Sequence, residues 1–183
     1  MSQRQTIEIE ESGMLFGPFQ KETVFHIENS RLYSHVNRGE GSVPTAEFLL
    51  LHRFESSSTA PSLWIVEAKS SAPRPGNKED FGTFIQGINA KLASSLILII
   101  AAFLGRHPSH NDLPMSFLTQ NYSSISIKLI LVLRGHKKEW LEPISDALQK
   151  TFKSTARIWN FHPEDVVVLN DEMARKQKLI RGS

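Results

Sequence analysis

A helical pattern across residues 80–104 is the feature that most constrains how this chain can fold. Apolar side chains recur there at the three- and four-residue spacing of one helix face, directly after an apolar strand segment. The most apolar stretch, residues 92–104, is thirteen residues long, well short of the ~20 that a bilayer-spanning helix needs. The pattern therefore predicts a long helix buried against a sheet, with no membrane partner. Gly105 and Pro108 predict where this helix ends.

Strand patterns flank this helix on both sides. Residues 43–54 have a continuous apolar centre, and a Ser/Thr/Pro segment at 56–61 leads them into residues 63–69, so the two segments predict a hairpin. The order of elements predicts an α/β fold with a mixed central β-sheet flanked by helices. The other expected elements are strands at 7–10, 126–133 and 166–169, helices at 23–36, 139–152 and 171–178, and a turn-rich connection through Gly13, Gly17 and Pro18.

The composition excludes several classes of site. The 183 residues contain no cysteine, so we expect no disulfide framework, thiolate nucleophile or cysteine zinc site, and a metal would need oxygen or imidazole ligands. Lys and Arg number 21 against 19 Asp and Glu, and a net charge of +2 does not by itself indicate a nucleic-acid partner. The N-terminus lacks the apolar segment of a secretory signal, which favours a cytoplasmic protein. We expect one domain over residues 1–183.

Charged side chains at one end of the predicted hairpin form a candidate catalytic site. Strand alternation puts Glu67 and Lys69 on one face, and pairing with the preceding strand would bring Glu47 beside them. Carboxylate oxygens suit Mg²⁺ (or Mn²⁺), and Mg²⁺ keeps several waters and takes its remaining contacts from substrate phosphate. Such a metal acidifies a water, while a lysine positions that water or stabilises negative charge on phosphorus. We therefore expect Glu47 and Glu67 to ligate a metal for phosphodiester hydrolysis.

The same residues carry a resemblance to a known family. A strand segment that begins at Pro44 and contains Glu47, followed by Glu67-Ala68-Lys69, a Pro/Gly break and a long helix, resembles the core of the PD-(D/E)XK nuclease superfamily. The resemblance implies a restriction-endonuclease-like αβββαβ core over about 23–133, with about 134–183 as a helix–strand–helix extension. It also implies Mg²⁺-dependent cleavage of nucleic acid, of DNA more often than RNA.

The match to the family motif is partial. Glu67 and Lys69 match the E-x-K pair. Glu47 stands where the family usually has aspartate, and Pro44 is displaced from its usual place directly before that acid. Because glutamate is one methylene longer than aspartate, ion geometry at this position requires a shifted backbone.

Further family residues are carried over from positions outside the motif. Many members use a glutamate from the first helix, for which Glu28 is the best-placed residue here. Some members add a glutamine in the helix after the lysine strand, which Gln86 matches, with Ala90 in place of the expected tyrosine. As phosphate contacts to a nucleic acid we expect Arg74, Lys78 and Lys91.

Several functions remain open at this point. The leading prediction is a metal-dependent nuclease, and the second is a catalytically inactive protein of the same fold that binds nucleic acid or protein, because Glu47 replaces the usual aspartate. A structural α/β domain would result if Glu47 and Glu67 lay on opposite faces, with Glu67 and Lys69 as a solvated ion pair. A glycosidase is disfavoured, since the adjacent lysine lowers carboxyl pKa values. The region after Leu133 completes the sheet and offers a surface for a homo-oligomer.

Overall fold

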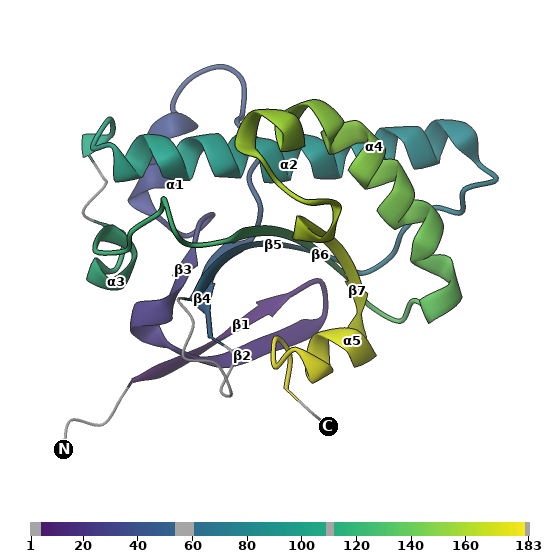
Figure 1. Ribbon diagram of the computed structural model, residues 1–183, viewed down its shortest axis with the longest axis horizontal. Coiled ribbons are helices and arrows are strands. Elements are labelled where there is room, and N and C mark those ends of the chain that lie inside the picture. The colour runs from purple at the N-terminus through teal and green to yellow at the C-terminus, as the bar shows by residue number, and fades with distance from the viewer. Residues whose placement is uncertain (1–4, 54–60, 109–111, 182–183) are drawn as a thin grey trace.

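The chain folds as a mixed α/β structure, which confirms the predicted class. The computed structural model describes residues 5–53, 61–108 and 112–181. A five-stranded mixed sheet and a two-stranded hairpin are flanked by helices (Figure 1). The Ser-rich loop predicted near residues 56–59 lies outside the described residues.

The central sheet has the order β3-β4-β5-β6-β7. The predicted hairpin is confirmed, because β4 pairs antiparallel with β5 and places Phe48 opposite Val66. Strand β3 pairs antiparallel with β4, whereas β5, β6 and β7 run parallel. The strands are β3 (Val24–His26), β4 (Phe48–His52), β5 (Ser62–Lys69), β6 (Ile127–Leu133) and β7 (Val166–Asn170).

The long helix α2 (Lys78–Phe103) connects β5 to β6 across one face of the sheet (Figure 1). Its buried face, which includes Ile88 and Leu92, packs in the same core as Leu49 and Ile65 of the sheet. By length and composition α2 could also cross a membrane, a test that core helices of soluble proteins pass as well. Here its apolar stripe meets the sheet, as the pattern at residues 80–104 predicts, and the chain leaves the helix at Gly105 with φ of +66°.

A hairpin covers the other face of the sheet. Strands β1 (Thr6–Glu11) and β2 (Met14–Gln20) pair antiparallel, and the two residues between them have positive φ, 53° at Ser12 and 72° at Gly13. Such a two-residue turn matches the right-handed twist of hairpin strands. The prediction of a turn-rich connection over this segment is wrong, because Gly17 and Pro18 interrupt the apolar alternation of β2 without ending the strand.

The predicted helix at 23–36 is wrong in its first half. A short 3-10 helix, η1 (Lys21–Thr23), precedes β3, and α1 (Arg31–Val36) begins only after the Ser30 cap. Val24 and Phe25 look helical in sequence, but they are consecutive strand residues whose side chains enter different cores on the two faces of the sheet. Glu28 therefore lies in the connection between β3 and α1, not on a helix.

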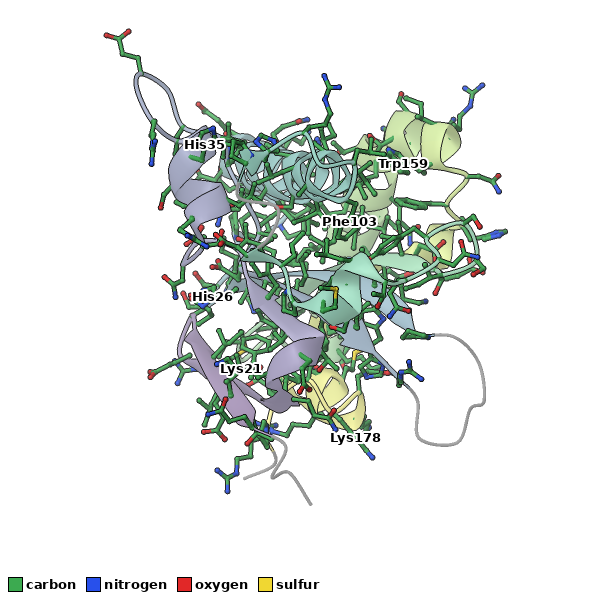
Figure 2. All side chains as sticks on the ribbon, turned by 90° about the vertical axis from the view of Figure 1, so that its left-hand side faces the viewer. Lys21, His26, His35, Phe103, Trp159 and Lys178 are labelled. Carbon is green, nitrogen blue, oxygen red and sulfur yellow. The ribbon has the colours of Figure 1, made fainter. Side chains whose placement is uncertain are left out.

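The C-terminal region folds as helix, strand and helix. Helix α4 (Glu142–Trp159) packs beside α2 and extends beyond the predicted 139–152, whereas α5 (Asp171–Lys176) lies on the hairpin side (Figure 1). Figure 2 shows this layering from the side, with His35 in the helix layer, His26 near the level of the sheet and Lys178 below. Short elements complete the chain: α3 (Met115–Leu118), η3 (Lys138–Trp140) and η4 (Pro163–Asp165).

Candidate active site

The β4–β5 register places two acidic side chains opposite each other at one end of the hairpin. Phe48 pairs with Val66, so the next position along the ladder sets Glu47 opposite Glu67. The Glu47 N–H donates to the Val66 carbonyl at 3.0 Å, which extends the ladder to this residue. Both acids lie on the face that α2 covers; Glu67 is 0% exposed and Glu47 is 5% exposed. A solvated strand face is therefore excluded for Glu67, and so is the arrangement with the two acids on opposite faces.

Backbone contacts from two other elements fix the position of Glu47. The Ala46 N–H donates to Ser95 Oγ of α2 at 2.7 Å, and the Ile27 N–H donates to the Glu47 carbonyl at 2.9 Å. Ser95 is fully buried, so its hydroxyl serves this contact rather than solvent. In the sequence, Ser95 is a polar residue within an apolar run. That interruption is the one signal that could have identified it as a buried hydrogen-bonding residue.

Lys69 stands beside Glu67 on the same strand face. Its Nζ lies 2.6 Å from Glu67 Oε1, and its side chain is one-third exposed. Although two ammonium groups lie within ion-pairing distance of Oε1, this oxygen accepts no well-directed hydrogen bond. Two ammonium groups therefore compensate the charge of this buried carboxylate oxygen.

Lys91 of α2 lies among the carboxylates. Its Nζ is 3.1 Å from Glu67 Oε1, 3.5 Å from Glu47 Oε1 and 3.8 Å from Glu28 Oε1, and it donates to Glu67 Oε2 at 3.3 Å. We predicted Lys91 as a phosphate contact, whereas the structure pairs its ammonium with three acids. Its helical spacing from Ile88 and Ser95 already puts it on the buried face, and a charge at such a position signals a buried partner.

Burial and mutual repulsion shift the protonation of this cluster. Burial, and then the neighbouring Glu67, raise the pKa of Glu47 to about 7, while Lys91 acts in the opposite direction. Burial also raises the pKa of Glu67, against the lowering effect of Lys69 and Lys91. Burial disfavours the charged form of Lys91, but Glu67 and Glu47 outweigh it and raise its pKa. Near neutral pH Glu47 therefore exchanges between its protonated and charged forms.

The remaining predicted residues occupy different places. Glu28 joins the cluster from its loop, with a side chain 38% exposed at the edge of the site. Gln86 is exposed on α2, about 140° around the helix axis from Lys91 at 3.6 residues per turn, so the structure does not bring it into the cluster. Arg74 and Lys78 are exposed on the connection that follows β5 and at the start of α2.

The tip of the β1–β2 hairpin reaches the same end of β5. Ser12 Oγ donates to the Ala68 carbonyl at 2.9 Å, and Glu11 lies 3.3 Å from His26 Nε2. The absence of a Cβ at Gly13 leaves room for the Arg134 guanidinium. The sequence carries no local signal for these contacts, since 56 positions separate Ser12 from Ala68.

The donor set fits a hard divalent cation that keeps most of its water. Within the described residues, no group of three or more His, Cys, Asp or Glu side chains is arranged to hold a metal ion. Mg²⁺, however, is often bound by one or two carboxylates plus substrate phosphate. The opposed carboxyl groups of Glu47 and Glu67 supply two such ligands, with the ammonium of Lys91 within 4 Å of both.

Comparisons of the chain with protein-family models, with curated proteins and with solved structures found no match. The interpretation of this site therefore depends on its residues and their geometry.

Proposed function

We propose that this protein is a metal-dependent nuclease of the PD-(D/E)XK type, which cleaves phosphodiester bonds in cytoplasmic nucleic acid, DNA more often than RNA. The observation that carries the proposal is the pairing of Glu47 with Glu67 on adjacent strands, with Lys69 Nζ 2.6 Å from Glu67. Two carboxylates and one ammonium at the end of a hairpin are the groups that this chemistry needs.

The order of the sheet supports the proposal. A meander of three antiparallel strands, β3, β4 and β5, leads through α2 to the parallel strand β6, as in the βββαβ part of the proposed core. The first helix departs from that plan, since α1 follows β3 instead of preceding it. Glu28 nevertheless reaches the cluster, because the connection that carries it is held to Glu47 by the Ile27 hydrogen bond.

Each side chain has a distinct role in the proposed reaction. Glu47 and Glu67 would hold Mg²⁺ or Mn²⁺, which, when bound, acidifies a water and offsets charge on phosphorus. Lys69, one-third exposed beside Glu67, faces both solvent and the carboxylates, so its ammonium can position that water or stabilise the negative charge that builds on phosphate. Lys91 keeps the acids together in the metal-free protein. Its ammonium lies within 4 Å of both proposed ligands and competes for their oxygens.

A catalytically inactive protein of the same fold, binding nucleic acid or protein, is the second candidate. The position of Lys91 favours it, because two ammonium groups already balance much of the charge on Glu28, Glu47 and Glu67. In this case the cluster would be a structural ion-pair network. The glutamate at position 47, where the PD-(D/E)XK family usually has aspartate, would then accompany a loss of metal binding.

Cleavage of labelled DNA with Mg²⁺ or Mn²⁺ tests the two candidates. We expect cleavage that EDTA stops and that Lys69→Ala abolishes while circular dichroism and the melting temperature stay close to wild type. Lys150→Ala, an exposed lysine on α4, is the matched control and should retain cleavage. Full activity of Lys69→Ala, or activity in EDTA, would overturn the proposal. Calorimetry that shows no Mn²⁺ binding, together with uncut DNA, would favour the inactive candidate.

A further inference from the structure

A concave surface lies at the carboxyl end of β5 and β6, the end of the sheet that carries the proposed active site. It is a cavity of about 460 Å³ between the connection that leaves β5 and the segment that follows β6. Its walls include Pro73, Arg74, Pro75, His136 and Trp140. The volume lies within the range of small-ligand pockets, and proline and aromatic walls suit a flat, partly apolar group.

Trp140 gives this pocket its chemistry. The ring is 50% exposed, whereas Trp64 in the sheet is 2% exposed. Lys137 Nζ lies 5.4 Å from the Trp140 ring centroid, and the His136 ring meets it edge to face at 6.1 Å. A cation near the ring and an aromatic neighbour hold the indole in place, although much of it still faces solvent. An aromatic surface held in this way is suited to stacking against another planar ring.

Arg74 is the cationic residue of the pocket wall, and Lys137 and Lys138 line the cavity next to it. Across the part of the chain that the structure describes, Arg74, Lys137 and Lys138 form no ion pair within 4.0 Å. The neighbouring acids of α5 are already engaged, because Asp171 lies 3.9 Å from Arg175 and Glu172 lies 2.6 Å from Lys176. Glu139 is the acidic residue of the pocket wall. Arg74 is therefore available for a phosphate group, whereas Lys137 already lies over the Trp140 ring.

The pocket and the Glu47–Glu67–Lys69 cluster lie at the same edge of the sheet. Ala72, at the pocket wall, follows Lys69 by three residues, which span at most about 11 Å. Directly after the neighbouring strand β6, the Arg134 N–H donates to the Lys69 carbonyl at 3.0 Å, and His136 of the pocket follows two residues later. A short strand of nucleic acid with one phosphate at Lys69 can therefore reach Trp140.

We propose that this pocket binds an unpaired base of the nucleic-acid strand that the active site cleaves, so the substrate contains a single-stranded segment. This inference rests on the proposed nuclease function. Trp140 stacks on the base, Pro73 and Pro75 form the facing apolar wall, and Arg74 contacts a flanking phosphate. Stacking on an aromatic side chain needs a base released from the duplex, so the pocket selects for single-stranded or frayed substrate.

Fluorescence anisotropy with a labelled oligo-dT in EDTA tests this inference, because binding is then measured without cleavage. We expect Trp140→Ala to weaken binding by about fivefold to a hundredfold, the effect of removing one stacked base. Trp140→Phe, which keeps an aromatic ring, should retain most of the wild-type affinity for oligo-dT. Ile158→Ala removes another exposed apolar side chain, 81% exposed on α4, and should bind as wild type does. A fully paired duplex of the same length should show little dependence on Trp140.

The outcomes separate this inference from the nuclease proposal. Unchanged binding of oligo-dT by Trp140→Ala, or an equal loss in Ile158→Ala, would overturn the base-binding pocket even if cleavage by the wild type stands. Binding that depends on Trp140 in a protein that cleaves nothing would keep the pocket and reject the nuclease. Absence of any oligo-dT binding by the wild type would overturn the pocket as well.

Discussion

The two faces of β5 bury different kinds of side chain. Toward the β1–β2 hairpin, Trp64, Val66 and Ala68 belong to an apolar cluster with Phe16, and Trp64 also stacks on the His52 ring at 3.9 Å between centroids. Toward α2, the same strand buries the Glu67 carboxylate. Replacing a buried ion pair by well-packed apolar residues is often neutral or stabilising, so stability alone does not account for an ion cluster in this core. Both faces bury apolar side chains, but within the described residues the α2 face also buries two carboxylates, and the proposed function places the reaction there.

The largest effect on stability is expected on the hairpin face. Phe16 is fully buried and meets Phe48 edge to face at 5.2 Å. Phe16→Ala should lower the free energy of unfolding by about 3–5 kcal/mol, because it removes apolar area and leaves a cavity. Urea unfolding measures this loss. If the two faces have separate roles, the folded fraction of the variant should cleave DNA as the wild type does, and a specific loss of cleavage by folded protein would contradict that separation.

Glu67→Gln, in contrast to Phe16→Ala, should lose cleavage and keep most of its stability. The substitution preserves the shape of the side chain but removes the charge that faces Lys69 and Lys91. We expect cleavage to fall by at least about a hundredfold, close to 3 kcal/mol of transition-state stabilisation, while stability changes by no more than about 2 kcal/mol. Steady-state cleavage and urea unfolding measure the two effects. Gln86→Ala, on the exposed side of the same helix as Lys91, is the comparison variant, and an equal loss there would contradict the assignment.

A pH dependence of stability should arise from the α2 face. The pKa of Glu47 is about 7 in the folded protein and near 4.5 in the unfolded chain, so the folded state holds its proton to higher pH. Stability from this group is complete below pH 4.5 and is lost as pH rises toward 7 and above. The shift corresponds to about 3 kcal/mol, and partial solvent contact at Lys69 and Lys91 reduces the expected loss to roughly 1–2 kcal/mol. Urea unfolding at pH 5 and pH 8 should show a smaller loss in Glu47→Gln than in the wild type, because the pKa of Glu67 is raised as well.

The smallest expected effect concerns competition for the carboxylates. Lys91→Met removes the ammonium that contacts Glu28, Glu47 and Glu67 but keeps a long side chain in its place. We expect Mn²⁺ to bind about fivefold more tightly, close to 1 kcal/mol, because a cation no longer displaces the lysine. Titration calorimetry measures the affinity, with Lys78→Met as the control. Weaker binding by Lys91→Met would show that Lys91 supports the metal site.

Local periodicity predicts much of the architecture and the centre of the site. Alternation with a period of two puts Glu67 and Lys69 on one strand face, and the strand order around the hairpin puts Glu47 near them. The buried helix follows from its apolar spacing in the same way. These features depend on residues that are close in sequence, so they can be predicted without a structure.

The features that sequence reasoning missed depend on contacts between distant segments. The three residues of β3 are too few to show alternation, and their side chains divide between two cores. Strand β2 contains Gly17 and Pro18, which usually signal a turn. The Ser12 contact to Ala68 is set by how the hairpin packs across the sheet, not by local pattern. The pairing of Lys91 with acids could have been predicted from its helical spacing to Ile88 and Ser95, since a lysine on a buried helix face needs an acidic partner.

The β1–β2 hairpin also determines how far the chain can be shortened from its N-terminus. Removing the first 22 residues, to leave a piece that starts at the edge of the proposed catalytic core, would uncover Phe48, Trp64 and Val66 to water. A contiguous apolar surface of that kind promotes self-association. Deletion studies of this protein should therefore keep the N-terminal strands, because a trimmed chain would precipitate before its chemistry could be assayed.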